Sequence, residues 1–374
     1  MNSLPRTAHV KPQAPIERVT ASAYRIPTDA PEADGTLSWD STTLIVTEVD
    51  GGGRRGLGYT YSDRCIVPLL QEKLARVVAR ADALDPPAAW RDMQRAVRNL
   101  GREGLAATAI SALDTAIWDL KAKLLDAPLA RLLGAYRSQV PVYGSGGFTS
   151  YTERRLTEQL GGWVEHEGCR WVKMKVGSDP EADPRRVAAA KKAIGERTLF
   201  VDANGAYDTK QALRLAQRFA DEARVGWFEE PVSSDDLSGL HAVREGAPFC
   251  MDIAAGEYGY TADYFRRMLG AQAVDVQQAD VTRCGGYTGF LQVAALCEAE
   301  HIDLSGHCAP SIHLHAACAA PRLRHLEWFH DHVRIEQLLF EGAPRAREGA
   351  IHPDWSRPGL GLEFKRQDAQ RFAV

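Results

Sequence analysis

The chain has 374 residues, of which 45% are hydrophobic and 25% are charged, and its formal net charge is -4. This composition is typical of a globular protein, and the length allows two domains and a large core. The sequence has no basic stripe and no apolar run near the roughly 18 residues of a spanning helix. We therefore expect neither a nucleic-acid partner nor a membrane role.

The first residues, "MNSLPRTAHVKPQAPIERV", lack the apolar segment of a signal peptide. We interpret residues 1–16 as a loose N-terminal tail and expect a cytoplasmic protein. The seven cysteines are scattered, and no two of them form a CxxC pair. This distribution favours reduced, mostly buried thiols over a disulfide framework or a zinc site.

Residues 17–135 are predicted to form an α+β domain. In "TTLIVTEVDGGGRRGLGYTYS", β-branched residues alternate on both sides of a glycine-rich turn, which indicates a hairpin. From about residue 65 the spacing becomes helical. One apolar stripe is formed by Ile110, Leu113, Ile117, Leu120 and Leu124.

Residues 136–345 repeat a pattern of strand, loop and helix. Eight short apolar runs recur: "VPVYG", "WVKMKV", "TLFVDA", "VGWFEE", "FCMDIA", "AVDVQQ", "IDLSG" and "RHLEWF". Eight βα units in about 200 residues predict a TIM-type barrel, with the active site at the carboxyl ends of the strands. A doubly wound open sheet is the alternative, but no GxGxxG follows the first strand. Residues 346–374 then form a C-terminal segment.

Ionisable residues stand at or just beyond the carboxyl end of nearly every predicted strand. In strand order they are Lys173 and Lys175, Asp202, Glu229 and Glu230, Glu257, Asp280, His307, and Glu327. Each alone is most simply a solvated rim residue or a structural histidine. Their joint placement at one end of a barrel favours a functional site.

Three of the acids, Asp202, Glu229 and Glu257, follow three successive strands. Adjacent strands lie about 5 Å apart, so these side chains can converge on one point. Carboxylates that close would raise one another's pKa unless a cation lay between them. An all-carboxylate set suits Mg2+, and we expect that cofactor.

A metal ion next to two lysines and a histidine suits the removal of a proton from the carbon next to a substrate carboxylate. That step gives an enediolate. We expect Lys175, with its pKa depressed by Lys173 and the cation, to be the base. Lys173 would also bind the substrate carboxylate. Asp280 would fix the tautomer of His307, which serves as the second acid or base. Glu327, if protonated, would donate a hydrogen bond to the enediolate.

With these residues in this order, the sequence resembles the enolase superfamily, mandelate racemase subgroup. The matching motifs are "KMK", "VDAN", "EEP", "AGE", "ADVTRCGG", "SGH" and "HLE", and "AISALDTAIWDLKAKLLDAPLARLLGA" resembles the helix of the family's capping domain. The resemblance implies a capping domain over 17–135 that the segment 346–374 rejoins, a carboxylate substrate and a homo-oligomer. It also implies that Glu229, rather than Glu230, is the metal ligand of "EEP".

The resemblance leaves the reaction open. We favour dehydration of a sugar acid to a 2-keto-3-deoxy acid, in which His307 expels the β-hydroxyl as water. The alternative is a racemase or epimerase of a 2-hydroxy acid or amino-acid derivative, with reprotonation from the opposite face. A barrel that only binds a ligand would predict a broken catalytic set, and no matched position is substituted.

Specificity is expected in the capping loop at 27–41 and beyond the last two strands. The loop carries Trp39 and four acids, namely Asp29, Glu32, Asp34 and Asp40. These acids argue against a dianionic substrate and favour a monoacid with hydroxyls or a cationic group. Further candidate contacts are His330, Asp331 and Arg334. We expect His313 and His315 to begin a helix rather than bind zinc, and Cys308 to line the pocket.

Overall fold

The computed structural model describes residues 13–374, so most of the tail expected at 1–16 lies outside the described residues. The chain begins with a three-stranded antiparallel sheet in the order β1-β2-β3. Its strands are β1 (Ile16–Ala33), β2 (Ser38–Gly51) and β3 (Arg54–Tyr61). The hairpin predicted on either side of the glycine-rich turn is confirmed as β2 and β3.

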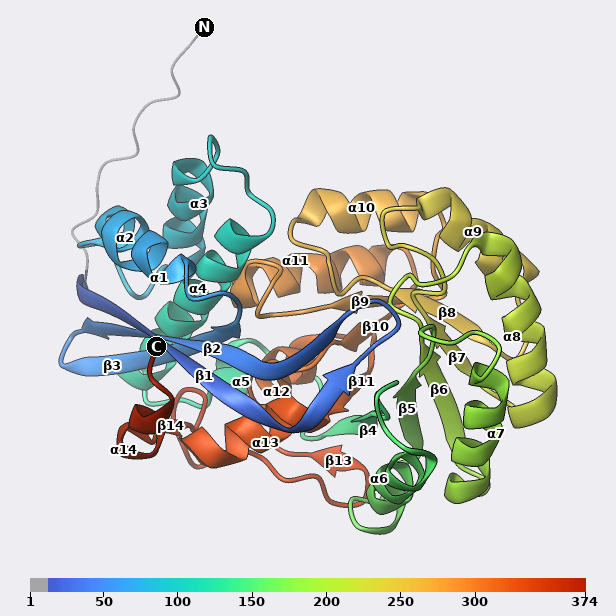
Figure 1. The fold of residues 1–374 in the computed structure, drawn as a ribbon. Coiled ribbons are helices and arrows are strands. Elements are labelled where there is room, and N and C mark those ends of the chain that lie inside the picture. Colours follow the sequence, from blue (N-terminus) through green and yellow to red (C-terminus); the bar gives the residue numbers. More distant parts are fainter. Residues whose placement is uncertain (1–12) are drawn as a thin grey trace, which may run out of the picture.

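Helices cover one face of this sheet (Figure 1). The helical elements of this part of the chain are α1 (Ile66–Pro68), the π-helix η1 (Leu69–Leu74), α2 (Ala75–Val78), α3 (Pro86–Ala96), α4 (Leu105–Leu124) and α5 (Leu129–Leu132), of which α5 packs on α4 and on the barrel. The predicted apolar stripe lies on α4, where Ile110, Leu113, Ile117 and Leu120 are fully buried. Since α4 packs on β3 on one side and on α11 (Gly286–Ala299) of the barrel on the other, it is buried almost all round.

The contact between β3 and α4 is too close for any side chain on two of the strand's residues. A Cβ atom on Gly56 would lie 2.0 Å from the carbonyl oxygen of Ala116. A Cβ atom on Gly58 would lie 2.2 Å from that of Ala112. Glycine at these positions lets the strand backbone rest directly on the helix backbone.

The eight predicted barrel strands are confirmed, and pairing of the last with the first closes the sheet, which excludes the open doubly wound alternative. They are β4 (Val140–Gly146), β5 (Trp171–Lys175), β6 (Thr198–Asp202), β7 (Trp227–Glu229), β8 (Asp252–Ala255), β9 (Val276–Ala279), β10 (Asp303–Gly306) and β11 (Leu323–Phe329). All eight run parallel.

Helices surround the barrel strands (Figure 1). They are α6 (Glu153–Glu165), α7 (Asp183–Ile194), α8 (Thr209–Ala223), α9 (Leu237–Gly246), α10 (Ala262–Gly270), α11 (Gly286–Ala299), α12 (Pro310–Ala319) and α13 (His330–Leu339). A buried cluster containing Tyr143, Phe200 and Trp227 fills the barrel interior. His325 packs against all three rings, so the interior below the site is a packed plug.

The C-terminal segment contacts both parts of the molecule. It holds β12 (Phe340–Glu341), β13 (Ala350–Ile351), β14 (Glu363–Phe364), α14 (Arg366–Ala369) and the 3-10 helix η2 (Gln370–Phe372). Strand β13 pairs with β4, and the backbone N–H of Val374 donates to Ala23 of β1. We propose the division predicted from the sequence, with a cap over 17–135, a barrel over 136–345 and a C-terminal segment over 346–374.

The segment expected as a capping loop at 27–41 is instead largely the end of a long hairpin formed by β1 and β2. Its strands remain paired up to Ala33 and Ser38, although the register shifts between Pro27 and Glu32. The side chain of Asp34 closes the turn by accepting hydrogen bonds from the backbone N–H groups of Thr36 and Leu37. Such an Asx turn gives the chain local order that a composition rich in acids and turn residues does not reveal.

The end of the hairpin lies across the carboxyl ends of the barrel strands (Figure 1). Thr149 donates to the carbonyl groups of Ala33 and Asp34 at 2.8 and 2.7 Å. Thr42 donates to Asp331 at 2.5 Å. These contacts join the cap to loops and helices of the barrel and turn an open barrel end into a covered one.

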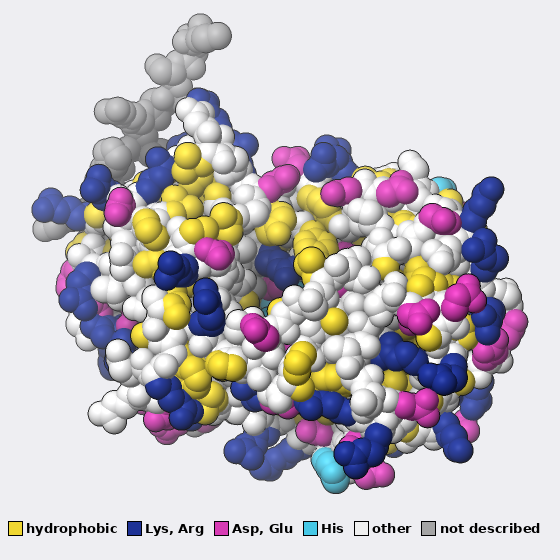
Figure 2. All heavy atoms as spheres, in the orientation of Figure 1, with side chains coloured by type: hydrophobic (Ala, Val, Ile, Leu, Met, Phe, Trp, Pro, Cys, Tyr) yellow, Lys and Arg dark blue, Asp and Glu magenta, His cyan; other side chains and the backbone are white. Residues whose placement is uncertain are grey.

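The surface offers no large region of one charge on the face drawn in Figure 2, where basic and acidic side chains are interspersed over both domains. A hollow of about 890 Å³ separates the cap from α10 beside the α4–α11 contact. Within residues 13–374, no helix has the length and hydrophobicity needed to cross a bilayer.

We predict that Gly58→Ala destabilises the protein, because the added methyl group must displace the α4 backbone. Overpacking of this kind costs about 1–3 kcal/mol. Gly270→Ala is the matched control, since a Cβ atom there would meet nothing within 4 Å. Thermal unfolding of the two variants should show a lower Tm for Gly58→Ala alone. Equal Tm values would contradict the close packing of β3 on α4.

Candidate active site

A cavity of about 400 Å³ lies between the carboxyl ends of the barrel strands and the cap. The barrel contributes Lys175, Asn204, Glu257, Tyr258, Arg283, His307, Cys308, Glu327, Phe329 and His332. The cap contributes Asp34, Trp39, Ser41, Thr42, Thr43, Tyr61, Ser62 and Asp63. The barrel wall is therefore rich in ionisable groups, whereas the cap wall is mainly hydroxyl, aromatic and acidic.

The three acids predicted to bind a metal converge. One carboxylate oxygen from each of Asp202, Glu229 and Glu257 lies within 4.8 Å of the others, and all three residues are buried. Asp202 and Glu229 are register partners on β6 and β7, and Glu257 follows β8. Oε2 of Glu257 accepts no hydrogen bond, although Nε2 of His307 lies 3.2 Å from it. A buried all-oxygen set with an unsatisfied acceptor fits Mg2+.

The pKa values of the three acids show that the neighbouring positive charges do not fully compensate the three carboxylates. Burial and the neighbouring Asp202 raise the pKa of Glu229 to about 8. Burial also raises the pKa of Asp202 and of Glu257, but Lys175 and Lys173 together outweigh it for Asp202, and His307 and Arg283 together for Glu257, so both pKa values are lowered. The raised pKa of Glu229 thus reflects repulsion among the three acids, which a bound cation would relieve.

The two lysines of β5 occupy the same face of the strand and point into the barrel. Lys173 is fully buried, contacts Glu229, and lies 2.8 Å from Glu327 and 3.2 Å from Asp202. Lys175 donates to Asp202 at 2.5 Å and to Asn204 at 3.0 Å, and it lines the cavity. The alternation of side chains along a strand thus delivers both ammonium groups to the acids.

The expectation of a depressed pKa for Lys175 is not met in this arrangement. Burial and the neighbouring Lys173 lower the pKa of Lys175, but Asp202 raises it, with further contributions from Glu257 and Glu229, and the balance lies above the ordinary value. The sequence pattern showed the second lysine but not that an oxygen of Asp202 lies in direct contact with Nζ.

His307 is held as predicted. Its Nδ1 lies 2.8 Å from Oδ2 of Asp280, whose other oxygen accepts two hydrogen bonds from Thr282. Burial raises the pKa of Asp280, but His307, His313 and Arg283 together more than reverse this, so Asp280 stays ionised and accepts from Nδ1–H. Nε2 then faces the cavity, on the far side of the barrel mouth from Lys175.

Glu327 differs from the expectation of a protonated hydrogen-bond donor. Its Oε1 accepts from Ser145 at 2.5 Å and lies 2.8 Å from Lys173, and its Oε2 accepts from the backbone N–H of Cys308 at 3.0 Å. Burial raises the pKa of Glu327, but Lys173 and His307 lower it far more. The carboxylate is therefore ionised and acts as an acceptor, because the lysine of β5 reaches across the barrel to it.

Of the predicted substrate contacts, Trp39 lines the cavity and the others do not. His330 lies 3.2 Å from Asp29, Asp331 accepts from Thr42, and Arg334 donates to the carbonyl of Pro27 at 2.6 Å. All three residues of α13 thus fix the end of the hairpin. The sequence could not distinguish residues that hold the hairpin from residues that contact the substrate, since both kinds lie near the mouth of the barrel.

Several cavity residues were not singled out in the sequence. Asn204 belongs to "VDAN" and Arg283 to "ADVTRCGG", so the motifs themselves contained that signal. Arg283 donates to the carbonyl of Glu257 at 3.0 Å. Tyr61 and Asp63 come from the end of β3, and only docking of the cap brings them to the cavity. His313 and His315 lie within α12, as expected, and bond to backbone groups.

Comparison with known families finds two family models that match this chain. Residues 20–134 match the model of the mandelate racemase / muconate lactonizing enzyme N-terminal domain, and residues 155–369 match the enolase C-terminal domain-like model. The chain belongs to the enolase superfamily. The predicted resemblance, the TIM-type barrel and its capping domain are confirmed.

Solved structures of this superfamily resemble the chain closely. One is a mandelate racemase/muconate lactonizing enzyme-like protein from Rubrobacter xylanophilus, with 55% identity, a TM-score of 0.94, and coverage of 96% of this chain and 100% of that one. A second is a racemase from Streptomyces coelicolor with bound magnesium, with 32% identity, a TM-score of 0.90 and the same coverage. The chain is a Mg2+-dependent enzyme of the enolase superfamily.

Curated relatives carry several activities. A 3,6-anhydro-alpha-L-galactonate cycloisomerase from Streptomyces coelicolor is 33% identical over 96% of this chain and 99% of its own length. The L-talarate/galactarate dehydratase of Salmonella typhimurium is 30% identical, with coverage of 94% and 89%. The D-gluconate dehydratase of Thermoproteus tenax is also 30% identical, with coverage of 91% and 72%.

We predict that Mg2+ raises the Tm of the chelator-treated protein, because an ion that binds the folded chain alone stabilises it by about 2.7 kcal/mol at 100 times its Kd. Glu229→Gln should lose most of this shift. Glu230→Gln is the matched control, since Glu230 is equally buried but is not among the three converging acids. Loss of the shift in Glu230→Gln, with retention in Glu229→Gln, would reverse the assignment within "EEP".

A second prediction concerns Glu32, which is buried under the end of the hairpin beside Asp331. Burial, reinforced by Asp331, raises the pKa of Glu32 to about 8. The stabilisation that the protonated carboxyl provides is fully present below the pKa of this group in the unfolded chain. It is lost as the pH rises through the pKa of the group in the folded chain. Between about pH 6 and about pH 9, the Tm of the wild type should therefore fall more than that of Glu32→Gln. Parallel curves for these two proteins, with exposed Asp40→Asn as a control, would contradict the burial of this carboxyl.

Proposed function

We propose that the enzyme dehydrates a sugar acid with a single carboxylate to a 2-keto-3-deoxy acid. The observation that carries this proposal is the placement of Lys175 and His307 across one cavity, with the three converging carboxylates beside them. A base and an acid on two sides of a substrate suit the removal of a proton from one carbon and of hydroxide from the next.

In this reaction Nζ of Lys175 takes the C2 proton, and the electron pair of the C2–H bond is held first by the substrate carboxylate as an enediolate. Asn204, bonded to Nζ, orients the amine. Bound among Asp202, Glu229 and Glu257, Mg2+ would supply positive charge for that carboxylate and neutralise the acids that raise the pKa of Lys175. Lys173 would add a second positive charge on the same side.

The second half of the reaction belongs to His307. Protonated at Nε2, it gives that proton to the β-hydroxyl as the C3–O bond breaks, so that water leaves and a C2–C3 double bond forms. The resulting enol takes up a proton at C3 and becomes the 2-keto acid. Asp280 keeps Nδ1 protonated and compensates the positive charge of the ring.

The cavity wall supports a substrate with one carboxylate. The lysine and the arginine that line it, Lys175 and Arg283, each lie beside a carboxylate of the barrel. The cap wall offers Asp34 and Asp63 together with hydroxyl groups. A second carboxylate at that end would meet like charges, whereas sugar hydroxyls would find hydrogen-bond acceptors and donors. The activity named for the D-gluconate dehydratase agrees with this choice, and that of the L-talarate/galactarate dehydratase does not.

Racemisation or epimerisation is the second candidate. It uses the same pair of residues, because His307 could return a proton to C2 from the face opposite Lys175. One solved relative is described as a racemase. The two reactions differ in whether the C3–O bond breaks, which can be observed directly.

We predict that proton NMR in D2O, with Mg2+ and a panel of sugar acids, detects loss of an aldonate and a new deoxy C3 signal beside a keto group. Aldarates, with two carboxylates, should be turned over far more slowly. Loss of the C2 signal from an otherwise intact compound would instead indicate a racemase or epimerase. Strong turnover of an aldarate would contradict the single-carboxylate proposal.

Two variants test the two steps of the proposed reaction separately. Lys175→Ala should lose turnover by at least about 100-fold, the lower end for removal of a general base. Exposed Lys192→Ala serves as its control. His307→Asn should stop elimination yet still exchange the C2 proton with solvent, because Lys175 remains. Loss of C2 exchange in His307→Asn, with retention in Lys175→Ala, would show that the two roles are interchanged.

A further inference from the structure

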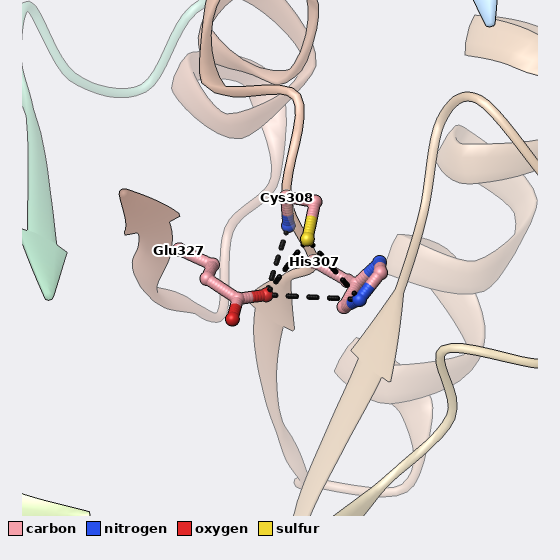
Figure 3. Close-up of side chains that lie close together, drawn as sticks. All are labelled: His307, Cys308 and Glu327. Atoms are coloured by element: carbon pink, nitrogen blue, oxygen red, sulfur yellow. Dashed lines mark hydrogen bonds and ion pairs between the residues drawn. The ribbon is translucent and has the colours of Figure 1, made fainter. Parts of the chain in front are cut away.

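Three unlike donor atoms meet at one corner of the cavity, and Figure 3 shows their side chains pointing toward one another. Sγ of Cys308 lies 3.3 Å from Nε2 of His307 and 3.3 Å from Oε2 of Glu327. The remaining pair, Nε2 and Oε2, is separated by 3.7 Å. We call these residues the His-Cys-Glu cluster. All three are buried and all three line the cavity.

The spacing of the cluster matches that of zinc ligands. In a tetrahedral Zn2+ site, bond lengths of about 2.0–2.3 Å place a sulfur about 3.5 Å from an N or O ligand and place N and O about 3.4 Å apart. The three observed separations lie within a few tenths of an ångström of these values. Side chains that merely shared hydrogen bonds would not need all three distances to be this similar.

His307 and Glu327 are each held in place through their second polar atom. Nδ1 of His307 is bonded to Asp280, which is the arrangement of a carboxylate–histidine–zinc triad, while Nε2 faces the cluster and also lies 3.2 Å from Oε2 of Glu257. Oε1 of Glu327 is bonded to Ser145 and paired with Lys173, while Oε2 faces the cluster and also accepts from the backbone N–H of Cys308 at 3.0 Å. Cys308 has a positive φ of 51°, a conformation uncommon for a residue other than glycine.

The cluster differs in chemistry from the three converging carboxylates, which offer oxygen alone. Thiolate and imidazole ligands select Zn2+ and similar thiophilic ions, whereas carboxylates suit Mg2+. We propose that the His-Cys-Glu cluster is a second metal site, for Zn2+ or Cd2+, and that an ion bound there inhibits the enzyme. On binding, Sγ and Nε2 each form a bond to the ion, and the thiol proton and the proton of Nε2 pass to solvent. The fourth position faces the cavity.

Inhibition follows from the atom that the ion would occupy. Nε2 of His307 is the atom that transfers a proton in the proposed function, and only this inhibitory part of the inference rests on that function. With Nε2 bound to an ion, proton transfer to the β-hydroxyl stops. Cys308 would thus allow a metal ion to inhibit the enzyme, although its thiol takes no part in the reaction.

Metal binding can be tested without an assay of turnover. The protein is saturated with Mg2+ and titrated with Cd2+, and the ultraviolet absorption of the Cd2+–thiolate bond is recorded. Because Cys65 and Cys250 are exposed, both are first replaced by Ser. We expect a band that saturates at one equivalent, disappears in Cys308→Ser and persists in Cys284→Ser, a buried control. A band unchanged by Cys308→Ser would overturn the site.

Inhibition is tested with Zn2+ in the presence of excess Mg2+, each variant being compared with its own rate without Zn2+. The Zn2+ concentration that halves the rate should rise by more than about tenfold in Cys308→Ser, as expected when a ligand is lost. An unchanged value would mean that Zn2+ acts by displacing Mg2+, and would overturn the inhibitory role. If no sugar acid is turned over, the proposed function fails while the Cd2+ titration still decides whether the site exists.

Discussion

Charge compensation inside the barrel is the constraint on which the rest of the structure depends. Four carboxylates and two ammonium groups are buried together there, namely those of Asp202, Glu229, Glu257, Glu327, Lys173 and Lys175. A buried charge without a partner costs several kcal/mol, so the groups are tolerable only as a set. The two lysines do not fully neutralise these acids, as the raised pKa of Glu229 shows, and a cation bound among the acids would relieve the repulsion. The same electrostatics that hold the end of the barrel together thus favour binding of Mg2+.

The site is shared unequally between the two parts of the chain. Rigid parallel strands carry the lysines, the acids and the histidine, so their mutual distances follow from strand spacing and register. The cap contributes hydroxyls, Trp39 and two acids on a hairpin held by polar contacts. In the proposed reaction the barrel would therefore fix the groups that move protons, and the cap would supply side chains for substrate choice that can vary without disturbing them.

Much of this could be predicted from the sequence, for physical reasons. The barrel strands are short apolar runs because both of their faces are buried, and ionisable residues at their ends stand out against that background. The charge states could not be predicted in the same way. Whether Glu327 is protonated depends on Lys173 reaching it across the barrel, and the pKa of Lys175 depends on an oxygen of Asp202. The roles of His330 and Arg334 likewise depend on the docking of the cap.

The shifted register of the long hairpin has a consequence for access to the cavity. The base of the hairpin is fixed, because β3 lies backbone to backbone on α4 at Gly56 and Gly58. The ladder between β1 and β2 is interrupted between Pro27 and Glu32, so the portion over the mouth is held mainly by its contacts with α13 and Thr149. Opening of the mouth would therefore require these polar contacts to break, while the base of the hairpin could stay on α4. The aromatic plug closes the other end of the barrel, so product and water must leave by the route the substrate used.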